Sequence, residues 1–259
     1  MTFAVGGRAE LAGFRVSGFE TVGSTNALAL DAARNGDDGQ HWFAALEQTE
    51  GRGRQGRRWV SQKGNLAASL LLVFDRAGDF SGLGFVAGVA LAHAIKSLAP
   101  GLDAALKWPN DLLIGGGKAS GILLEAQGLA GGRQALAIGI GVNVVAAPAD
   151  LPYPATSLAE LGAALSAEAV FCALSDSFAD TFDLWGGGAG LADVLAIWRR
   201  HARGIGEPIA VSLSSGRLDG IFEALDDRGR LVLRDKSGGL NIVSAGDVHF
   251  GSAASATGR

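Results

Sequence analysis

The stretch from Glu47 to Trp59 carries the residues of this chain that are best suited to hold an anion. It places four arginines within seven residues, 52–58, and interleaves them with glycines. Arginine supplies fixed positive charge, and glycine lets backbone N–H groups approach a ligand closely. The whole chain carries 26 acidic against 22 basic residues, a formal net charge of −4. This glycine–arginine loop is therefore a local cradle for phosphate or carboxylate, and general affinity for nucleic acid is not expected.

Two common phosphate-binding motifs fit the loop poorly. Gly51, Gly53 and Gly56 match G-x-G-x-x-G, but only residues 57–64 separate them from the next expected strand. That interval is too short for the crossover helix of a dinucleotide-binding fold. A P-loop would end in Gly-Lys-Ser/Thr, whereas two arginines follow Gly56. An ordinary solvated basic turn stays open as the alternative to an anion cradle.

A second group of charged residues lies at 107–111, which reads Lys-Trp-Pro-Asn-Asp, and at 117–121, which reads Gly-Lys-Ala-Ser-Gly. A glycine turn between the two segments would fold the chain back and bring Lys107 and Lys118 to one ligand. With the arginines, these lysines could hold two anions together. Reaction of a carboxylate with a triphosphate needs such a site, because the reactants repel and charge develops on the phosphoryl group. Lys107 and Asp111 could instead form an ordinary surface pair.

The elements that position these residues are expected to form an α+β domain, with helices on a mixed, mostly antiparallel sheet. Ser24 has the residue type of an N-cap for a helix over 27–34, and the apolar run 66–74 has strand length. Segments joined by the short turns 115–117 and 128–132 must run antiparallel, because a parallel crossover needs a dozen or more residues. The other expected elements are strands at 42–46, 106–108, 111–114, 119–126 and 135–145, a capping box at 157–160, and helices at 83–98, 170–185 and 191–198.

The C-terminal part of the chain has a different pattern. Short β-like segments separated by Ser, Asp, Lys and Gly turns predict a small all-β barrel. These segments are 208–213, 217–225, 231–234 and 240–243. We expect a catalytic domain over 1–203 and a β domain over 204–252. The Ser/Ala/Gly-rich segment 253–259 has too little apolar surface to pack and is expected to be a disordered tail.

Several other classes of protein are not expected. The single cysteine, Cys172, cannot form an internal disulfide and suits a reducing compartment. The start of the chain has no apolar signal core, and the uncharged runs 80–95 and 134–149 fall short of the ~20 residues that span a bilayer. The histidines lack metal-like spacing and no Gly-x-Ser-x-Gly elbow occurs, so zinc and hydrolase chemistry are unsupported. We expect a cytoplasmic protein without a membrane or DNA partner.

A set of motifs in a fixed order carries a family resemblance. The motifs are EQTEGRGRQGRRWVS at 47–61, KWPND at 107–111, GKASGIL at 117–123 and GIGVN at 139–143, with Ser-Thr-Asn at 24–26 and Ala-Thr-Ser-Leu at 155–158. Together they resemble the biotin protein ligase family, also called biotin–[acetyl-CoA-carboxylase] ligase. The resemblance implies a class II synthetase-like catalytic domain with a small SH3-like C-terminal domain. It also implies ATP with Mg²⁺, whose protein ligands stay unknown, and biotin as substrate.

The reaction that this resemblance implies has two steps. Biotin and Mg-ATP give biotinyl-5′-AMP and pyrophosphate, and the biotinyl group then passes to one lysine of the biotin carboxyl carrier protein of acetyl-CoA carboxylase. By the same resemblance, the catalytic candidates are Lys118, Arg54, Asp111 and Lys107. The biotin-binding candidates are Ser24, Thr25, Asn26, Gln48, Arg52, Gly53, Arg54, Lys118 and Gly121. The nucleotide-binding candidates are Arg52, Arg54, Arg57, Trp59, Lys118 and Asn143.

The chain departs from the family pattern at two places. Some members begin with a DNA-binding helix-turn-helix domain and act as repressors, whereas too few residues precede Ser24 for that domain, so a repressor role is not expected. Gln55 stands where the family often has another basic residue, which bears on the affinity of the loop and leaves the reaction class unchanged. The family implies a homodimer or a monomer, and no motif decides between them.

Two alternative functions are weighed against this interpretation. A lipoate or octanoate ligase or transferase of related fold should lack the pairing of Gly-Arg-Gly-Arg with Lys-Trp-Pro-Asn-Asp. A nucleotide- or RNA-binding module would use the basic loop and the β barrel, but the C-terminal segment has nearly balanced charges and few aromatic residues on which bases could stack. The biotin ligase interpretation is therefore preferred.

Overall fold

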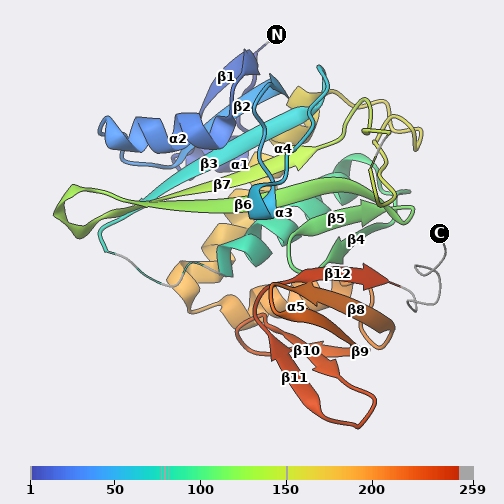
Figure 1. The fold of residues 1–259 in the computed structure, drawn as a ribbon. Helices are drawn as coiled ribbons and strands as arrows, with labels where there is room; N and C mark the ends of the chain where they lie inside the picture. Colours follow the sequence, from blue (N-terminus) through green and yellow to red (C-terminus); the bar gives the residue numbers. More distant parts are fainter. Residues whose placement is uncertain (1, 77, 79, 81, 150, 251–259) are drawn as a thin grey trace.

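The computed structural model describes residues 2–76, 78, 80, 82–149 and 151–250. These residues form a seven-stranded sheet flanked by helices and a separate five-stranded sheet at the C-terminal end (Figure 1). The expected α+β class, with a mixed and mostly antiparallel large sheet, is confirmed. The tail predicted at 253–259 lies outside the described residues.

The large sheet has the strand order β1-β2-β3-β7-β6-β5-β4. Only β1 and β2 run parallel, because helix α2 crosses over between them, and every other neighbouring pair is antiparallel. The sequence pattern did not reveal β1, an edge strand with mostly exposed side chains. The strands are β1 Arg15–Val22, β2 His41–Gln48, β3 Leu66–Phe74, β4 Ala104–Lys107, β5 Asp111–Ile114, β6 Gly117–Gly128 and β7 Gln134–Val142.

The helices divide between the two faces of this sheet (Figure 1). Alternate residues of β7, such as Leu136 and Ile138, join the main core with α3 and α4. The intervening Ala135 and Ala137 pack under α2 in a second, smaller core. The face that carries α2 is also the face on which the predicted site residues gather. The helices are α1 Gly7–Leu11, α2 Thr25–Arg34, α3 Gly82–Leu98, α4 Ala167–Trp185 and α5 Leu191–His201, with 3₁₀ turns at Arg54–Gly56, Ala130–Gly132 and Gly186–Gly188.

The second sheet is antiparallel throughout, in the order β11-β10-β9-β8-β12. Four of its strands match the predicted segments, and β12 was not predicted. The buried Trp108 indole, in the turn after β4, donates to the Gly229 carbonyl between β9 and β10 at 2.9 Å and ties the two sheets together. The strands are β8 Pro208–Leu213, β9 Gly216–Leu225, β10 Leu231–Arg234, β11 Leu240–Val243 and β12 Asp247–Phe250.

The capping box at 157–160 forms but starts no helix. Ser157 N–H donates to Glu160 Oε2 at 2.8 Å, and Glu160 N–H donates to Ser157 Oγ at 3.2 Å. The chain then turns at Gly162, whose φ of +82° leaves the helical region. The next helix, α4, begins after the N-cap Ser166, whose hydroxyl accepts from Ala169 N–H.

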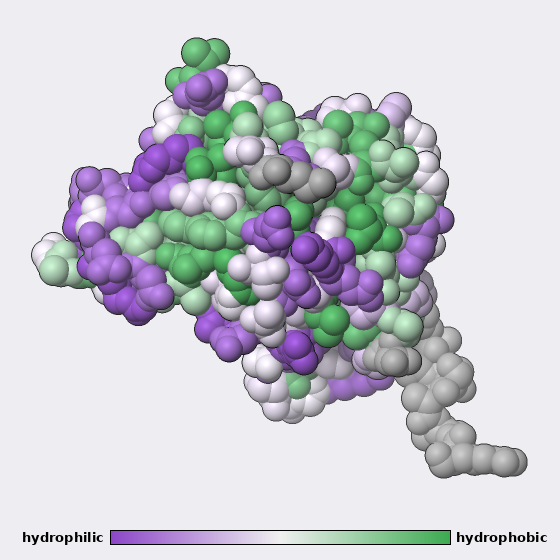
Figure 2. Space-filling model, turned by 90° about the horizontal axis from the view of Figure 1, so that it is seen from above, coloured by the Kyte–Doolittle hydropathy of each residue, from purple (hydrophilic) through white to green (hydrophobic). Residues whose placement is uncertain are grey.

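The surface is mixed in polarity. Seen from above, hydrophobic and hydrophilic side chains lie side by side over the molecule (Figure 2). Among the described residues no helix is both long enough and apolar enough to cross a bilayer. The large apolar side chains that are exposed in this part of the chain are Leu11, Phe19, Val60, Val145, Tyr153, Leu184, Ile205, Leu240 and Ile242.

Candidate active site

A cavity of about 710 Å³ lies between the large sheet, the glycine–arginine loop and β12. It collects predicted residues from the N-terminal end of α2, from β2, β4, β5 and β6, and from the loop. Asn143 is the one predicted site residue outside its lining. The predicted residues that line it are Ser24, Thr25, Asn26, Gln48, Arg52, Gly53, Arg54, Arg57, Trp59, Lys107, Asp111, Lys118 and Gly121.

The glycine–arginine loop folds back on itself over the cavity. Arg52 and Arg58 pair as an isolated antiparallel bridge, and Gly53 N–H donates to the Arg57 carbonyl at 2.7 Å. At the tip, Gln55 has φ +56° and Gly56 has φ +72°. Positive φ at both central residues is the geometry of a tight hairpin turn. The loop is thus a short hairpin that can present several arginines to one ligand.

Glycines line the side of the cavity that the large sheet forms. Gly121 on β6 lies opposite Gly141 on β7, and Gly139 follows on the same face. A Cβ atom at Gly139 would lie 2.5 Å from Asn26 Oδ1, and one at Gly141 would lie 2.5 Å from Trp59 Cε2. Any side chain here would displace a site residue. Close approach thus explains part of the unusual glycine content, 40 of 259 residues.

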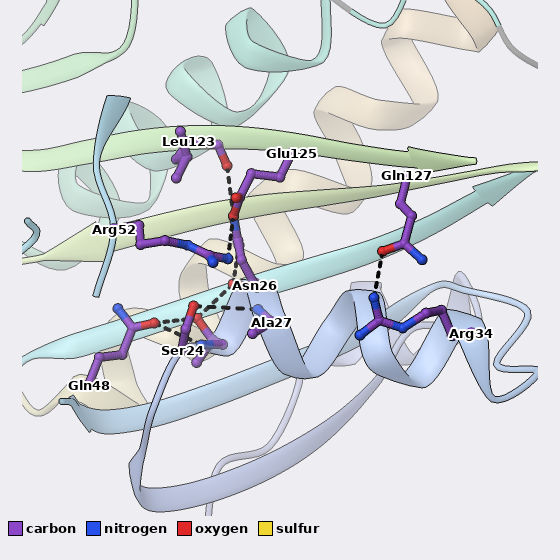
Figure 3. Close-up of polar contacts among 11 residues, drawn as sticks. Ser24, Asn26, Ala27, Arg34, Gln48, Arg52, Leu123, Glu125 and Gln127 are labelled. Carbon is purple, nitrogen blue, oxygen red and sulfur yellow. Dashed lines mark hydrogen bonds and ion pairs between the residues drawn. The ribbon is translucent and has the colours of Figure 1, made fainter. Parts of the chain in front are cut away.

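One end of the cavity is lined by neutral polar groups (Figure 3). Ser24 caps α2, because its hydroxyl accepts from Ala27 N–H at 3.4 Å. Thr25 donates to Gln48 Oε1 from its backbone N–H at 2.8 Å, and its hydroxyl oxygen lies 3.0 Å from the same atom. Ser24, Thr25 and Asn26 are at most 8% exposed. This end suits a small, uncharged ligand group that both donates and accepts hydrogen bonds.

A β-bulge turns Lys118 toward the cavity. The register between β5 and β6 shifts so that Leu112 pairs with Ser120 but Leu113 pairs with Lys118. Because side chains alternate along a strand, Lys118 would otherwise face away from Gly121, and the extra residue brings both to one face. The Lys118 ammonium lies 2.6 Å from Asp111 Oδ1, and both side chains are more than four-fifths buried.

Lys107 adds a second ammonium group to the cavity. It pairs in register with Asp111, and its Nζ lies 5.6 Å from the ring centre of Phe250 on β12. Burial lowers the pKa of Lys107 below its ordinary value; Asp111 opposes this shift and Lys118 adds to it. Two ammonium groups that repel each other in a shielded place favour a bound anion. Asp111 is paired with Lys118, so the simple surface pair of Lys107 with Asp111 is not found.

The C-terminal sheet holds part of the loop. Arg54 Nη1 donates to Asn110 Oδ1 at 3.0 Å and to the Gly246 carbonyl at 3.3 Å. Arg57 Nη2 donates to Asp247 Oδ1 at 2.9 Å. The loop is thus fixed by the turn before β5 on one side and by β12 on the other, so the C-terminal sheet completes the cavity wall.

Acidic residues that were not predicted balance part of the positive charge. The lining contains six Lys and Arg residues and three carboxylates, an excess of three positive charges in a chain of net charge −4. Glu125 and Asp247 were missed, since neither belongs to a spaced motif. For Glu125, the only signal in the sequence was an acidic residue within a segment that has a β-like pattern. Tyr153, whose ring centre lies 5.5 Å from Lys118 Nζ, was also missed.

Asn143 does not line the large cavity. It is 2% exposed and lines a separate small cavity of about 20 Å³ together with Trp59 and Lys118. Its amide nitrogen donates to the Thr156 carbonyl at 3.1 Å, and its backbone N–H donates to the Ala119 carbonyl at 2.8 Å. Asn143 therefore holds the bulged segment that carries Lys118, whatever contact it makes with a nucleotide.

Comparison with known proteins identifies the family of enzymes to which this chain belongs. Residues 19–143 match the model of the biotin/lipoate A/B protein ligase family, and residues 204–251 match the biotin protein ligase C terminal domain. Biotin–[acetyl-CoA-carboxylase] ligase of Paracoccus denitrificans is 39% identical over 243 residues, which cover 88% of this chain and 97% of that protein. The chain therefore belongs to the biotin/lipoate A/B protein ligase family.

Further relatives show which kind of ligase within this family the chain resembles. Biotin–[acetyl-CoA-carboxylase] ligase of Mycobacterium tuberculosis is 35% identical over 237 residues, which cover 88% of this chain and 85% of that protein. The solved structure of the biotin protein ligase from Aquifex aeolicus in complex with biotin and ATP covers 90% of this chain and 97% of its own, with a TM-score of 0.77 and 24% identity, and shows the shared fold. The chain groups with the biotin protein ligases.

Proposed function

We propose that this chain activates biotin with ATP and transfers it to a lysine of a carrier protein. The observation that carries the proposal is the cavity, in which a neutral polar end around Thr25 and Gln48 joins an end rich in Lys and Arg. Biotin has a ureido ring at one end and a carboxylate at the other, so it matches both ends. The names of the relatives support the same substrate.

In the first step, a carboxylate oxygen of biotin attacks the α-phosphorus of ATP and pyrophosphate leaves, which gives biotinyl-5′-AMP. We assign Lys118 to the carboxylate and α-phosphate oxygens, because its ammonium lies within the cavity and Asp111 holds it in place at 2.6 Å. Arg52 and Arg54, with Arg57 and Trp59, close over the ligand from the loop. Fixed positive groups offset the charge that grows on the phosphoryl group during attack.

In the second step, the ε-amine of a carrier lysine attacks the carbonyl of the mixed anhydride, AMP leaves, and the amine loses a proton. Lys107 and Asp111 lie where β4 and β5 meet and would frame the incoming lysine. A mixed anhydride hydrolyses when water reaches it, so the loop that covers the cavity protects it.

The partner that we propose is the biotin carboxyl carrier protein of acetyl-CoA carboxylase, and the proposed compartment is the cytoplasm. Mg²⁺ would enter with ATP, since this ion is usually held through substrate phosphates and one or two carboxylates. The proposed division of the chain is a catalytic domain over 1–203 and a C-terminal domain over 204–252.

Lipoate is a poorer match to the same cavity. Its dithiolane ring offers no hydrogen-bond partners comparable to a ureido group, so the polar groups of Thr25 and Gln48 would lose water without compensation. Sites built to bind polar groups discriminate strongly against ligands that lack them.

Biotin-dependent exchange between ATP and pyrophosphate tests the proposal. We expect exchange with biotin, and we expect Lys118→Ala to reduce it about 10²–10³-fold, as for loss of a single transition-state donor. Lys63→Ala, which breaks an exposed pair with Glu20 outside the cavity lining, is the control. Folded wild-type protein that is inactive with biotin but active with lipoate would refute the proposal.

A further inference from the structure

Glu125 on β6 belongs to none of the predicted motifs, yet its carboxylate joins two parts of the cavity. One oxygen, Oε2, accepts from Asn26 Nδ2 at 2.7 Å and from Arg52 Nη2 at 3.1 Å (Figure 3). Asn26 lies at the start of α2, whereas Arg52 lies in the glycine–arginine loop. The Glu125 side chain is 29% exposed, so these contacts are partly shielded from water.

The carboxylate determines the direction of the Asn26 amide. An ionised carboxylate only accepts hydrogen bonds, so the amide nitrogen faces Glu125. The amide oxygen then faces Ser69, whose hydroxyl donates to it at 2.6 Å. Asn26 is 5% exposed. A reversed amide would place its oxygen against the carboxylate oxygen, which costs free energy in a shielded place.

The contacts continue from Asn26 to the polar end of the cavity. Ser69 Oγ lies 2.7 Å from Thr25 Oγ1, and the backbone N–H of Thr25 donates to Gln48 Oε1 at 2.8 Å. Four candidate biotin-binding residues therefore lie on one unbroken series of polar contacts that passes through Glu125. Linked buried hydrogen bonds polarise one another and respond as a unit. In order, the series is Arg52, Glu125, Asn26, Ser69, Thr25 and Gln48.

We propose that Glu125 is a positioning residue that couples the glycine–arginine loop to the polar end of the cavity. Its charge holds Arg52 above the ligand site, and its hydrogen bond from Asn26 sets the donor and acceptor pattern that the ligand meets. The identity of that ligand as biotin rests on the proposed function. The coupling itself rests only on the contacts of Glu125.

The experiment compares five variants of the whole chain with the wild type: three at Glu125 and Gln127, and Arg52→Ala alone and combined with Glu125→Ala. Glu125→Ala removes both contacts, whereas Glu125→Gln keeps an acceptor for Asn26 and loses the charge that holds Arg52. Gln127→Ala is the matched control, because Gln127 lies two residues further along the same strand and, among the described residues, its side chain bonds only to Arg34. The readouts are trypsin cleavage within 52–58 without ligand, and the KM for biotin and kcat in ATP–pyrophosphate exchange.

For Glu125→Ala we expect faster cleavage of the loop, and a KM for biotin raised about tenfold with kcat changed less than about twofold, since a charge-assisted hydrogen bond is lost. Glu125→Gln should cleave like the alanine variant but recover most of the biotin KM. Gln127→Ala should match the wild type in both. Combining Arg52→Ala with Glu125→Ala should raise the KM by less than the product of the single effects.

Two results would overturn the inference. One is a Glu125→Ala variant with the loop cleavage and biotin KM of Gln127→Ala, even if it unfolds at a lower temperature. The other is a double variant whose effects simply multiply. Wild-type protein that fails to use biotin would refute the proposed function instead, and the cleavage comparison, made without ligand, would still decide whether Glu125 holds the loop.

Discussion

The indole ring of Trp59 lies directly against the backbone of Gly141. A Cβ atom at Gly141 would lie 2.5 Å from Trp59 Cε2, and one at Gly121, on the neighbouring strand, would lie 3.2 Å from Cζ3. The backbone N–H of Trp59 also donates to the Gly51 carbonyl at the start of the glycine–arginine loop. The position of the loop therefore depends on two strand glycines that are distant from it in sequence.

Gly141→Ala should move Trp59 and weaken ligand binding. An added methyl group in a packed place costs about 1–3 kcal/mol, whether the indole shifts or the strand does. We expect a lower free energy of unfolding in urea and a raised KM for ATP and biotin. Gly128→Ala is the control, because a Cβ atom there meets nothing within 4 Å on the same hairpin. Equal KM values for the two variants would contradict the role given to the Trp59–Gly141 contact.

Asp247→Ala tests whether the C-terminal sheet holds the loop. The variant frees Arg57, whose guanidinium lies 2.9 Å from the carboxylate and whose side chain is 52% exposed. An exposed pair contributes little, about 0.2–1 kcal/mol, so we expect a rise of at most about fivefold in the KM for ATP. The kcat should change less. Asp219→Ala, which breaks an exposed pair with Arg217, should leave both constants unchanged.

Helices, strands and turns with a strong pattern of apolar or turn-forming residues could be predicted from the sequence. The run Leu66–Phe74 is apolar except for Ser69, because both faces of β3 are covered, by α2 on one side and by the main core on the other. The short turns at 115–117 and 128–132 require antiparallel neighbours, which β5, β6 and β7 are. The anion site was predicted because four arginines lie among glycines within residues 52–58 of a chain with net negative charge.

The features that could not be predicted depend on contacts between residues that are distant in sequence. Strand β12, Asp-Val-His-Phe, alternates polar and apolar residues, but four residues are too few for this pattern to be distinctive, yet the strand supplies Asp247 to the cavity. The bulge that turns Lys118 toward Gly121 comes from the register with β5, which no local pattern reveals. Glu125 meets Arg52 across 73 positions of sequence. Single acidic residues of this kind acquire a role only through the fold.

The histidine pair His93 and His201 should make the fold sensitive to mild acid. Their ring centres lie 5.5 Å apart between α3 and α5. Burial lowers the pKa of both, and the positive charge of Arg200 adds to the effect. The unfolded chain then binds more protons between the lowered values and the ordinary value of 6.5, so stability rises with pH in that window and is lost on acidification.

Replacing both His93 and His201 with Asn should flatten this dependence. We expect the free energy of unfolding in urea to change less between pH 5 and pH 7 than in the wild type. Each single variant should give a smaller change, because the pKa of the remaining histidine is still lowered. An unchanged slope in the double variant would show that other groups cause the sensitivity to mild acid.

A second loss of folding stability, at lower pH, should come from Asp37, in the turn between α2 and β2. Its carboxylate accepts from His41 Nδ1 at 2.7 Å, from Gly39 N–H at 2.9 Å and from Arg15 Nη2 at 2.6 Å. Burial by itself raises the pKa of Asp37, but these hydrogen bonds outweigh it and hold the pKa below the ordinary value of 3.8. Ser17 Oγ, 2.9 Å from His41 Nε2, extends the contacts to β1.

Asp37→Asn should remove this contribution. A carboxyl group whose pKa is lowered in the folded state stabilises the fold above the unfolded value and loses that effect as pH falls through the folded value. We therefore expect the variant to be less stable than the wild type near neutral pH, with a difference that shrinks below pH 4. Asp38→Asn, at an 87% exposed side chain paired with Arg133, is the control and should change little. A difference between Asp37→Asn and the wild type that stays constant from pH 7 to pH 3 in urea unfolding would contradict the lowered pKa.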